Sequence, residues 1–76
     1  MREIIQMIAE SLVDSPEKVS VEEINGNNTT VIELCVAKHD LGKVIGKQGR
    51  TADAIRQILY SISCKEKKRT VLEIVE

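Results

Sequence analysis

The 76-residue sequence has few aromatic residues, cysteines and histidines, which build several common kinds of functional site. It has no Phe, no Trp and one tyrosine, Tyr60, which excludes a platform of aromatic rings for stacking nucleobases. Cys35 and Cys64 are far apart and show no zinc-ligand spacing, so we expect two buried, reduced thiols and no metal site. The one histidine, His39, has no nucleophile beside it; its place before a helix favours a structural role, with a ligand-facing donor as the alternative. We therefore expect no enzyme and no cofactor.

Long apolar runs are also missing. Crossing a bilayer takes roughly 18 apolar residues, and a signal peptide would need an apolar stretch where this chain begins with Arg2 and Glu3. We therefore expect a soluble, cytoplasmic protein without membrane contact. With 42% apolar and 30% charged residues the chain has the composition of a folded protein, and its length predicts a single domain over residues 1–76.

The formal net charge of −1 conceals a segregation of charge along the chain. Residues 1–37 carry two basic and seven acidic side chains, whereas residues 38–69 carry nine basic and three acidic ones. Because salt screens charges beyond about 8–10 Å, an anionic ligand would feel this local excess and not the total. A solvated helix face is the alternative explanation, but it suits Lys43, Lys47 and Arg50 poorly because they lie among glycines.

Apolar spacing and turn residues predict the order of the elements. Apolar residues recur at helical spacing, proline stops the first such run, and β-branched residues gather around a polar Asn-Gly turn. Asp40 is placed to act as the N-cap of a short helix. The expected segments are a helix over 3–13, strands over 18–24 and 29–37, helices over 41–45 and 50–64, and a strand over 70–75.

This order, α-β-β-α-α-β, predicts an α+β fold with a three-stranded mixed sheet covered on one face by helices. The first two strands form a hairpin, and the two-helix connection is long enough for a parallel crossover that brings the last strand beside the central one. In the long helix the expected core stripe consists of Ala52, Ile55, Ile58, Leu59 and Ile62.

The segment Gly42–Arg50 is rich in glycine and basic residues, and two nucleotide-binding loops must be considered for it. A Walker A loop needs four residues between its glycines and a Ser or Thr after the lysine; here three residues separate Gly42 from Gly46, and Gln48 follows Lys47. A dinucleotide fingerprint needs GxGxxG after a strand, whereas this GxxxGxxG joins two helices. Both assignments are rejected.

What remains is a GxxG turn, Gly46-Lys47-Gln48-Gly49, between two helices. Glycine at both corners lets another backbone approach closely, and the following helix presents free N–H groups beside Lys47 and Arg50. Such a turn can hold a sugar-phosphate strand. Alone it could equally be a simple helix-loop-helix connection, so its neighbours and the frame of elements decide between the two.

Together these features identify a family resemblance that extends over essentially the whole chain. The run Val44-Ile45-Gly46-Lys47-Gln48-Gly49-Arg50 resembles the VIGxxG signature of type II K-homology (KH) domains. The chain is similar above all to the small bacterial KhpA family, through its size, this run, Ala54-Ile55-Arg56 and the closing Lys67-Lys68-Arg69. The resemblance implies binding of single-stranded RNA by the GxxG loop, an RNA-chaperone or post-transcriptional role, and a link to cell-envelope growth and cell shape. It also implies a homodimer, or a heterodimer with a larger KH protein resembling KhpB.

The resemblance further implies which residues contact RNA. Gly46 and Gly49 shape the clamp, Lys47, Gln48 and Arg50 meet the phosphates, and Lys43 and Ile45 border the same groove, with Ile45 also expected in the core. Arg56 and Tyr60 are expected on the outer face of the long helix, where Tyr60 stacks on a base, lies in a dimer interface or is simply exposed. Lys67, Lys68 and Arg69 extend the basic track or form a solvated turn. Ala52 departs from the pattern, because many KH domains carry a larger residue there.

A second hypothesis from another class is an interaction subunit that supports a partner KH protein with little RNA contact of its own. A pure scaffold has no need of the two glycines and the basic loop, which favours the RNA-binding hypothesis. Single-stranded DNA would fit the same residues.

Overall fold

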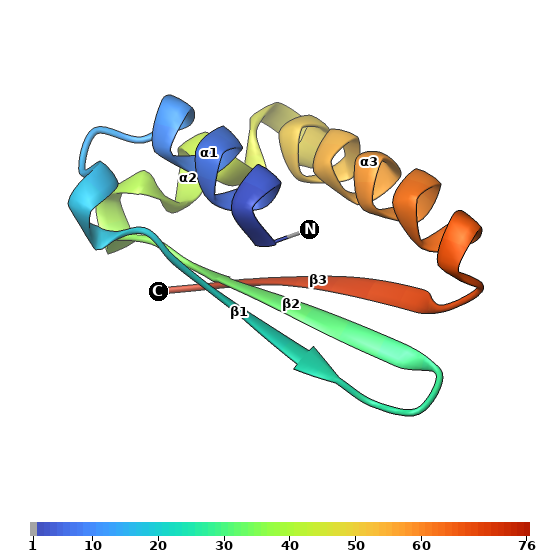
Figure 1. Ribbon diagram of the computed structural model, residues 1–76. Coiled ribbons are helices and arrows are strands. Elements are labelled where there is room, and N and C mark those ends of the chain that lie inside the picture. The colour runs from blue at the N-terminus through green and yellow to red at the C-terminus, as the bar shows by residue number, and fades with distance from the viewer. Residues whose placement is uncertain (1) are drawn as a thin grey trace.

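The computed structural model describes residues 2–76, with the backbone alone at Glu66. Helices lie on one side of a three-stranded sheet and leave its other side uncovered (Figure 1). This arrangement confirms the predicted α+β class and element order. The helices and strands are α1 (Arg2–Leu12), β1 (Ser20–Asn25), β2 (Thr29–Cys35), α2 (Leu41–Ile45), α3 (Arg50–Glu66) and β3 (Arg69–Val75).

The sheet is mixed, in the order β1-β2-β3. The first two strands form an antiparallel hairpin that ends at the Asn25↔Thr30 pair, and the N–H of Gly26 donates to the carbonyl of Thr29 at 2.7 Å across the turn. β3 runs parallel to β2 with Ile32 opposite Leu72, as expected for a strand that follows a helical crossover. The last strand therefore forms one edge of the sheet, beneath α3 (Figure 1).

One apolar core lies between the helices and the sheet. Alternate residues of β2 point toward the helices, and Ile32 and Leu34 are fully buried there. They belong to one buried cluster with residues from all three helices, among them Ile5 of α1 and Leu59 of α3. Burying each such side chain stabilises the fold by about 1.5–3 kcal/mol, so this cluster fixes the position of α2 and α3 over the sheet.

The core stripe of α3 differs from the expected one at Ile58. Ala52, Ile55, Leu59 and Ser63 are buried, at helical spacing, whereas Ile58 is 41% exposed and Ile62 is half-buried. The stripe is narrower because α3 packs on the sheet along one line and Ile58 lies to the side of that line. Ile58 is therefore a surface residue and not part of the core.

Asp40 does not act as the expected helix cap, because its side chain makes no capping bond to α2. Instead its fully buried carboxylate accepts the backbone N–H groups of Asp14 and Ser15, each at 3.1 Å. Burial raises the pKa of Asp40, but these two N–H bonds, with the nearby His39 and Lys43, more than offset that effect, so the pKa lies below its ordinary value. The carboxylate thus ties the end of α1 to the start of α2.

Both cysteines are free thiols, as predicted, but their burial differs from the expectation. Cys35 is half-buried on the uncovered face of the sheet, and Cys64 is exposed near the end of α3. Contact with the Cys64 thiol raises the pKa of the Tyr60 hydroxyl. Within residues 2–76, no helix has both the length and the apolar character that crossing a membrane requires.

Candidate nucleic-acid interface

The GxxG segment forms the turn between α2 and α3, as the sequence predicts. Three of its residues have left-handed backbone angles: Gly46 with φ 78°, Gln48 with φ 58° and Gly49 with φ 74°. Left-handed angles suit glycine because it has no Cβ to clash with the backbone. The turn therefore projects the exposed side chains of Lys47 and Gln48 into solvent, ahead of the first turn of α3.

The two glycines are required for different reasons. A Cβ at Gly46 would lie 2.8 Å from the backbone nitrogen of Thr51 and closer still to its side chain. A Cβ at Gly49 would meet nothing within 4 Å, so only its backbone angle demands glycine. Gly46 thus lets the turn lie directly against the start of α3.

The turn places several positive groups side by side. Gly49 is the N-cap residue of α3 and offers no capping side chain, so the N–H groups of the first turn lack a side-chain acceptor from that position. The helix N-terminus carries a partial positive charge, and the exposed side chains of Lys47 and Arg50 add full charges. Arg50 donates from Nη2 to Oε1 of Gln48 at 3.4 Å, which brings these two side chains together. This combination suits an anion such as a phosphate.

A depression of about 510 Å³ adjoins the turn. Ile45, Gly49, Ala52 and Arg56 line it from the helices, and β3 supplies residues 72–75. Ile45, expected both at the groove and in the core, is 39% exposed, while Val44 is fully buried. Neighbouring residues of a helix point about 100° apart, so the burial of Val44 turns Ile45 outward to border this depression. The small side chain of Ala52 also lies at its edge.

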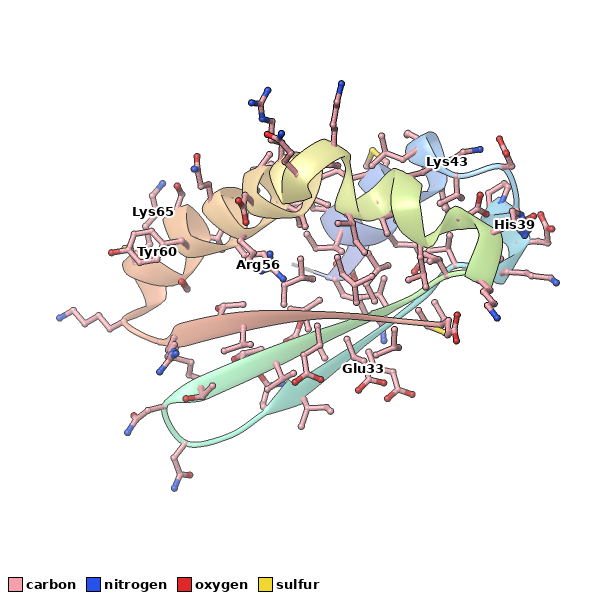
Figure 2. The ribbon with its side chains drawn as sticks, turned by 180° about the vertical axis from the view of Figure 1, so that it is seen from behind. Glu33, His39, Lys43, Arg56, Tyr60 and Lys65 are labelled. Atoms are coloured by element: carbon pink, nitrogen blue, oxygen red, sulfur yellow. The ribbon has the colours of Figure 1, made fainter. Side chains whose placement is uncertain are left out.

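The depression continues along α3. A second hollow of about 480 Å³ shares Arg56 and Leu72 with the first and reaches Tyr60 and Arg69. We call the two hollows together the α3–β3 groove. Arg56 and Tyr60 are exposed, but they line this groove instead of an outer face of the helix, and Figure 2 shows Arg56 pointing from α3 toward the sheet.

Lys43 lies apart from the other candidate residues. Its ammonium group forms an ion pair with Asp14 and lies 3.9 Å from Oδ1 of Asp40, and Lys43 does not line either hollow. It lies toward the end of the molecule that holds His39 (Figure 2). Of the candidate residues, the structure thus brings together Ile45, Gly46, Lys47, Gln48, Gly49 and Arg50 around the turn, and separates Lys43 from them.

Sequence reasoning did not identify the wall that β3 contributes to the groove. Leu72, Ile74 and Val75 line the first hollow, and Thr70 and Val71 line the second. A signal was available: a parallel crossover through α3 places the last strand directly beneath that helix. Side chains of α3 and of this edge strand then form the two walls of the groove.

Known proteins are similar to this chain over nearly its whole length. The family model for the KH domain of KhpA and KhpB matches residues 2–74. A protein of Caldanaerobacter subterraneus subsp. tengcongensis is 52% identical over 75 residues, which cover 99% of this chain and all of the relative. A protein of Aquifex aeolicus is 54% identical over 76 residues, covering 100% of this chain and 96% of the relative. A third, from Chlamydia trachomatis, is 47% identical over 76 residues, covering 100% and 97%.

All three relatives bear the name RNA-binding protein KhpA. Among solved structures, an Era variant from Aquifex aeolicus bound to GDP and AlF4− matches with a TM-score of 0.62 and 23% identity. The match covers 97% of this chain and 29% of that one, and it supports the fold alone. The family model and the full-length relatives show that this chain belongs to the KhpA/KhpB KH-domain family, which is not a family of enzymes.

Proposed function

We propose that this protein binds single-stranded RNA, with the GxxG turn as the clamp. The observation that carries the proposal is the position of this turn: it lies at the N-terminus of α3 and opens directly onto the α3–β3 groove. Full-length relatives named as RNA-binding proteins support RNA as the ligand. A KH loop of this kind clamps about four nucleotides of backbone.

In this proposal the residues of the turn hold the backbone and the groove holds the bases. Lys47, Arg50 and the free N–H groups of α3 contact phosphates, and Gln48 donates from its amide. Gly49, where a Cβ would meet open space, lets the strand approach the protein backbone, and Gly46 holds the turn against α3. The bases then lie over the apolar side chains of Ile45, Leu72 and Ile74. Lys43 stays outside the clamp unless it leaves its partner Asp14.

Two domains on one RNA strand are part of the proposal. A groove with few phosphate contacts and a single tyrosine binds weakly, whereas linking two such sites raises the effective concentration of the second. We therefore propose that the protein acts as a homodimer or with a larger KhpB-like KH protein, in the cytoplasm, as an RNA chaperone or post-transcriptional regulator. Effects on cell-envelope growth and cell shape would follow through the bound transcripts.

The test is the double variant Lys47→Asp with Gln48→Asp, measured by fluorescence anisotropy with a labelled single-stranded RNA. A matched control, Lys18→Asp with Asn27→Asp, changes the charge by the same amount at exposed positions that do not line the groove. We expect the clamp variant to lose at least tenfold in affinity and the control to stay within about twofold. Both should keep the wild-type circular dichroism spectrum. Equal affinities for the two variants would contradict the clamp, and RNA crosslinking found only on a KH partner would favour the interaction-subunit hypothesis.

A further inference from the structure

The uncovered face of the sheet carries its side chains in rows that run across the three strands. The strand register places Glu22 opposite Glu33 and Glu33 opposite Glu73, so three carboxylates form one row. Figure 2 shows Glu33 pointing away from the helices. Two residues farther along the strands, a second row is apolar and consists of Ile24, Val31 and Val71. We call the two rows together the open-face stripe.

The acidic row is not neutralised by the rest of the fold. With the described residues 2–76, none of the three glutamates forms an ion pair or a side-chain hydrogen bond. Arg69 lies on the same face of β3, but it is four residues, or about 13 Å, from Glu73 along the strand. Like charges opposite each other on strands about 5 Å apart destabilise a sheet. A cationic partner would relieve this repulsion.

The apolar row offers contact area beside this charge. Ile24 is 52% exposed, and Val31 and Val71 are half-buried, so a partner that covers them would remove apolar surface from water. The two rows are about 7 Å apart, since each residue of a strand advances about 3.4 Å. A partner that covers both rows therefore has to present cationic groups on one line and apolar groups on the next.

The charge of the open-face stripe argues against three other occupants. A second copy docked by a two-fold axis through this face would bring the glutamates of both copies into one interface, because such an interface uses the same surface on each copy. RNA is a polyanion and would also be repelled. A bare metal ion would leave the apolar row uncovered, and among the described residues no group of His, Cys, Asp and Glu side chains is arranged to hold one.

From these observations we propose that the open-face stripe binds a basic amphipathic helix of a partner protein. A helix advances about 5.4 Å per turn, close to the roughly 5 Å between strands, so a helix that crosses the strands meets about one strand with each turn. Lysine or arginine side chains at i, i+4 and i+7 then pair with the three glutamates, and apolar residues on the neighbouring line of the helix cover the apolar row. The proposal goes beyond RNA binding, since this face lies across the sheet from α2 and α3, which hold the GxxG turn between them (Figure 1).

The test uses a fluorescein-labelled peptide of about 16 residues, long enough to form a helix when bound. Its lysines lie at i, i+4 and i+7, its leucines occupy the neighbouring line, and alanine and glutamine fill the other positions. A scrambled peptide has the same composition. Fluorescence anisotropy with the full chain measures affinity, and backbone amide shifts locate the contact. We expect wild type to bind the periodic peptide about fivefold more tightly than the scrambled one, with the largest shifts in the three strands.

The double variant Glu22→Gln with Glu73→Gln removes two charges from the acidic row. We expect it to lose the preference for the periodic peptide and to melt about 2–6 °C higher than wild type, because the repulsion with Glu33 is relieved. The matched control, Glu10→Gln with Glu17→Gln, removes two exposed carboxylates outside the sheet. It should bind the peptide like wild type.

A further variant tests the apolar row. Val71→Thr keeps the shape of the side chain and should bind the periodic peptide about threefold more weakly. The proposal would be overturned by a Glu22→Gln/Glu73→Gln protein that binds this peptide as tightly as wild type, or by equal affinities of wild type for the two peptides. Amide shifts confined to α3, sheet shifts that appear with rising protein concentration alone, or sheet shifts produced by millimolar Mg²⁺ alone would overturn it in favour of the RNA groove, a second copy or a cation. The double variant should bind RNA like wild type, so failure of this proposal and failure of RNA binding are read separately.

Discussion

Gly46 and Thr51 lie so close that no side chain fits between them. A Cβ on Gly46 would lie 2.8 Å from the backbone nitrogen of Thr51, which belongs to the first turn of α3. Because a backbone atom is involved, the clash cannot be relieved by turning a side chain. The contact fixes the GxxG turn against the N-terminus of α3. In the proposed function, the free N–H groups of this helix end bind RNA phosphates.

The first prediction follows from this contact. Gly46→Ala should destabilise the fold by about 2–4 kcal/mol, since it adds a clash to a left-handed backbone angle. Gly49→Ala should cost only about 1–2 kcal/mol, because its Cβ would meet open space. Urea denaturation of both variants checks the order. Equal losses would show that the approach to Thr51 does not constrain the turn, and Gly49→Asn serves as a milder control because asparagine tolerates left-handed angles.

The second prediction separates two lysines of the same segment. Lys47→Ala should weaken RNA binding several-fold, because its exposed side chain lies in the clamp. Lys43→Ala should change RNA affinity less than twofold and lower the stability by at most about 1 kcal/mol, because Lys43 is engaged with Asp14. Anisotropy titrations of both variants in one buffer decide the point. A larger binding defect for Lys43→Ala would place that side chain on the RNA.

The third prediction concerns pH. Because the pKa of Asp40 is lowered in the folded state, its ionised form stabilises the fold above the ordinary value of 3.8, and this contribution is lost as the pH falls below that value. The melting temperature of the wild type should therefore fall steeply below about pH 4. Asp40→Asn should melt lower at pH 7 by at least about 5 °C and lose less on acidification.

A control for this prediction is Glu17→Gln, which removes an exposed carboxylate near the same turn. Its melting curve should follow the wild type at neutral pH, since the exposed Glu17 side chain makes no hydrogen bond or ion pair with the described residues 2–76. An Asp40→Asn protein as stable as wild type at pH 7 would contradict the tie between the end of α1 and the start of α2.

The fourth prediction concerns salt. Each phosphate contact to a single strand contributes about −0.7 to the slope of log K against log salt, so about two to four contacts give a slope between about −1.4 and −2.8. Arg50→Gln should reduce the magnitude of this slope by about 0.7. Anisotropy titrations between about 50 and 300 mM salt measure this slope. The range includes 0.1 M, where the Debye length is about 10 Å. An unchanged slope in Arg50→Gln would remove that residue from the phosphate contacts.

The element order and the mixed sheet could be predicted from sequence because their signals are local. The single proline, the Asn25-Gly26 turn and the apolar spacing each act within a few residues. Pairing of β3 with β2 followed from the length of the crossover and the rule for parallel connections. The GxxG turn could also be predicted from sequence, because Gly46 and Gly49 lie in one four-residue segment between the two expected helices.

Other features depend on contacts that the sequence does not encode locally. Asp40 accepts bonds from residues about 25 positions earlier, so its spacing to the next helix suggested a cap that does not form. Ile45 and Val44 are neighbours in a five-residue helix, too short for periodicity to decide which of them is buried. The sequence predicts that Ile58 and Cys64 are buried, but both are exposed. The reason is that nothing in the sequence shows how narrow the line of contact along α3 is.

The most direct test of the clamp is an NMR titration of the ¹⁵N-labelled protein with a short single-stranded RNA, following backbone amide shifts. We expect the largest shifts at residues 46–51 and smaller ones along the groove side of α3 and β3, with β1 unmoved. Shifts confined to the uncovered face of the sheet or to α1, with the amides of residues 46–51 unchanged, would contradict the account.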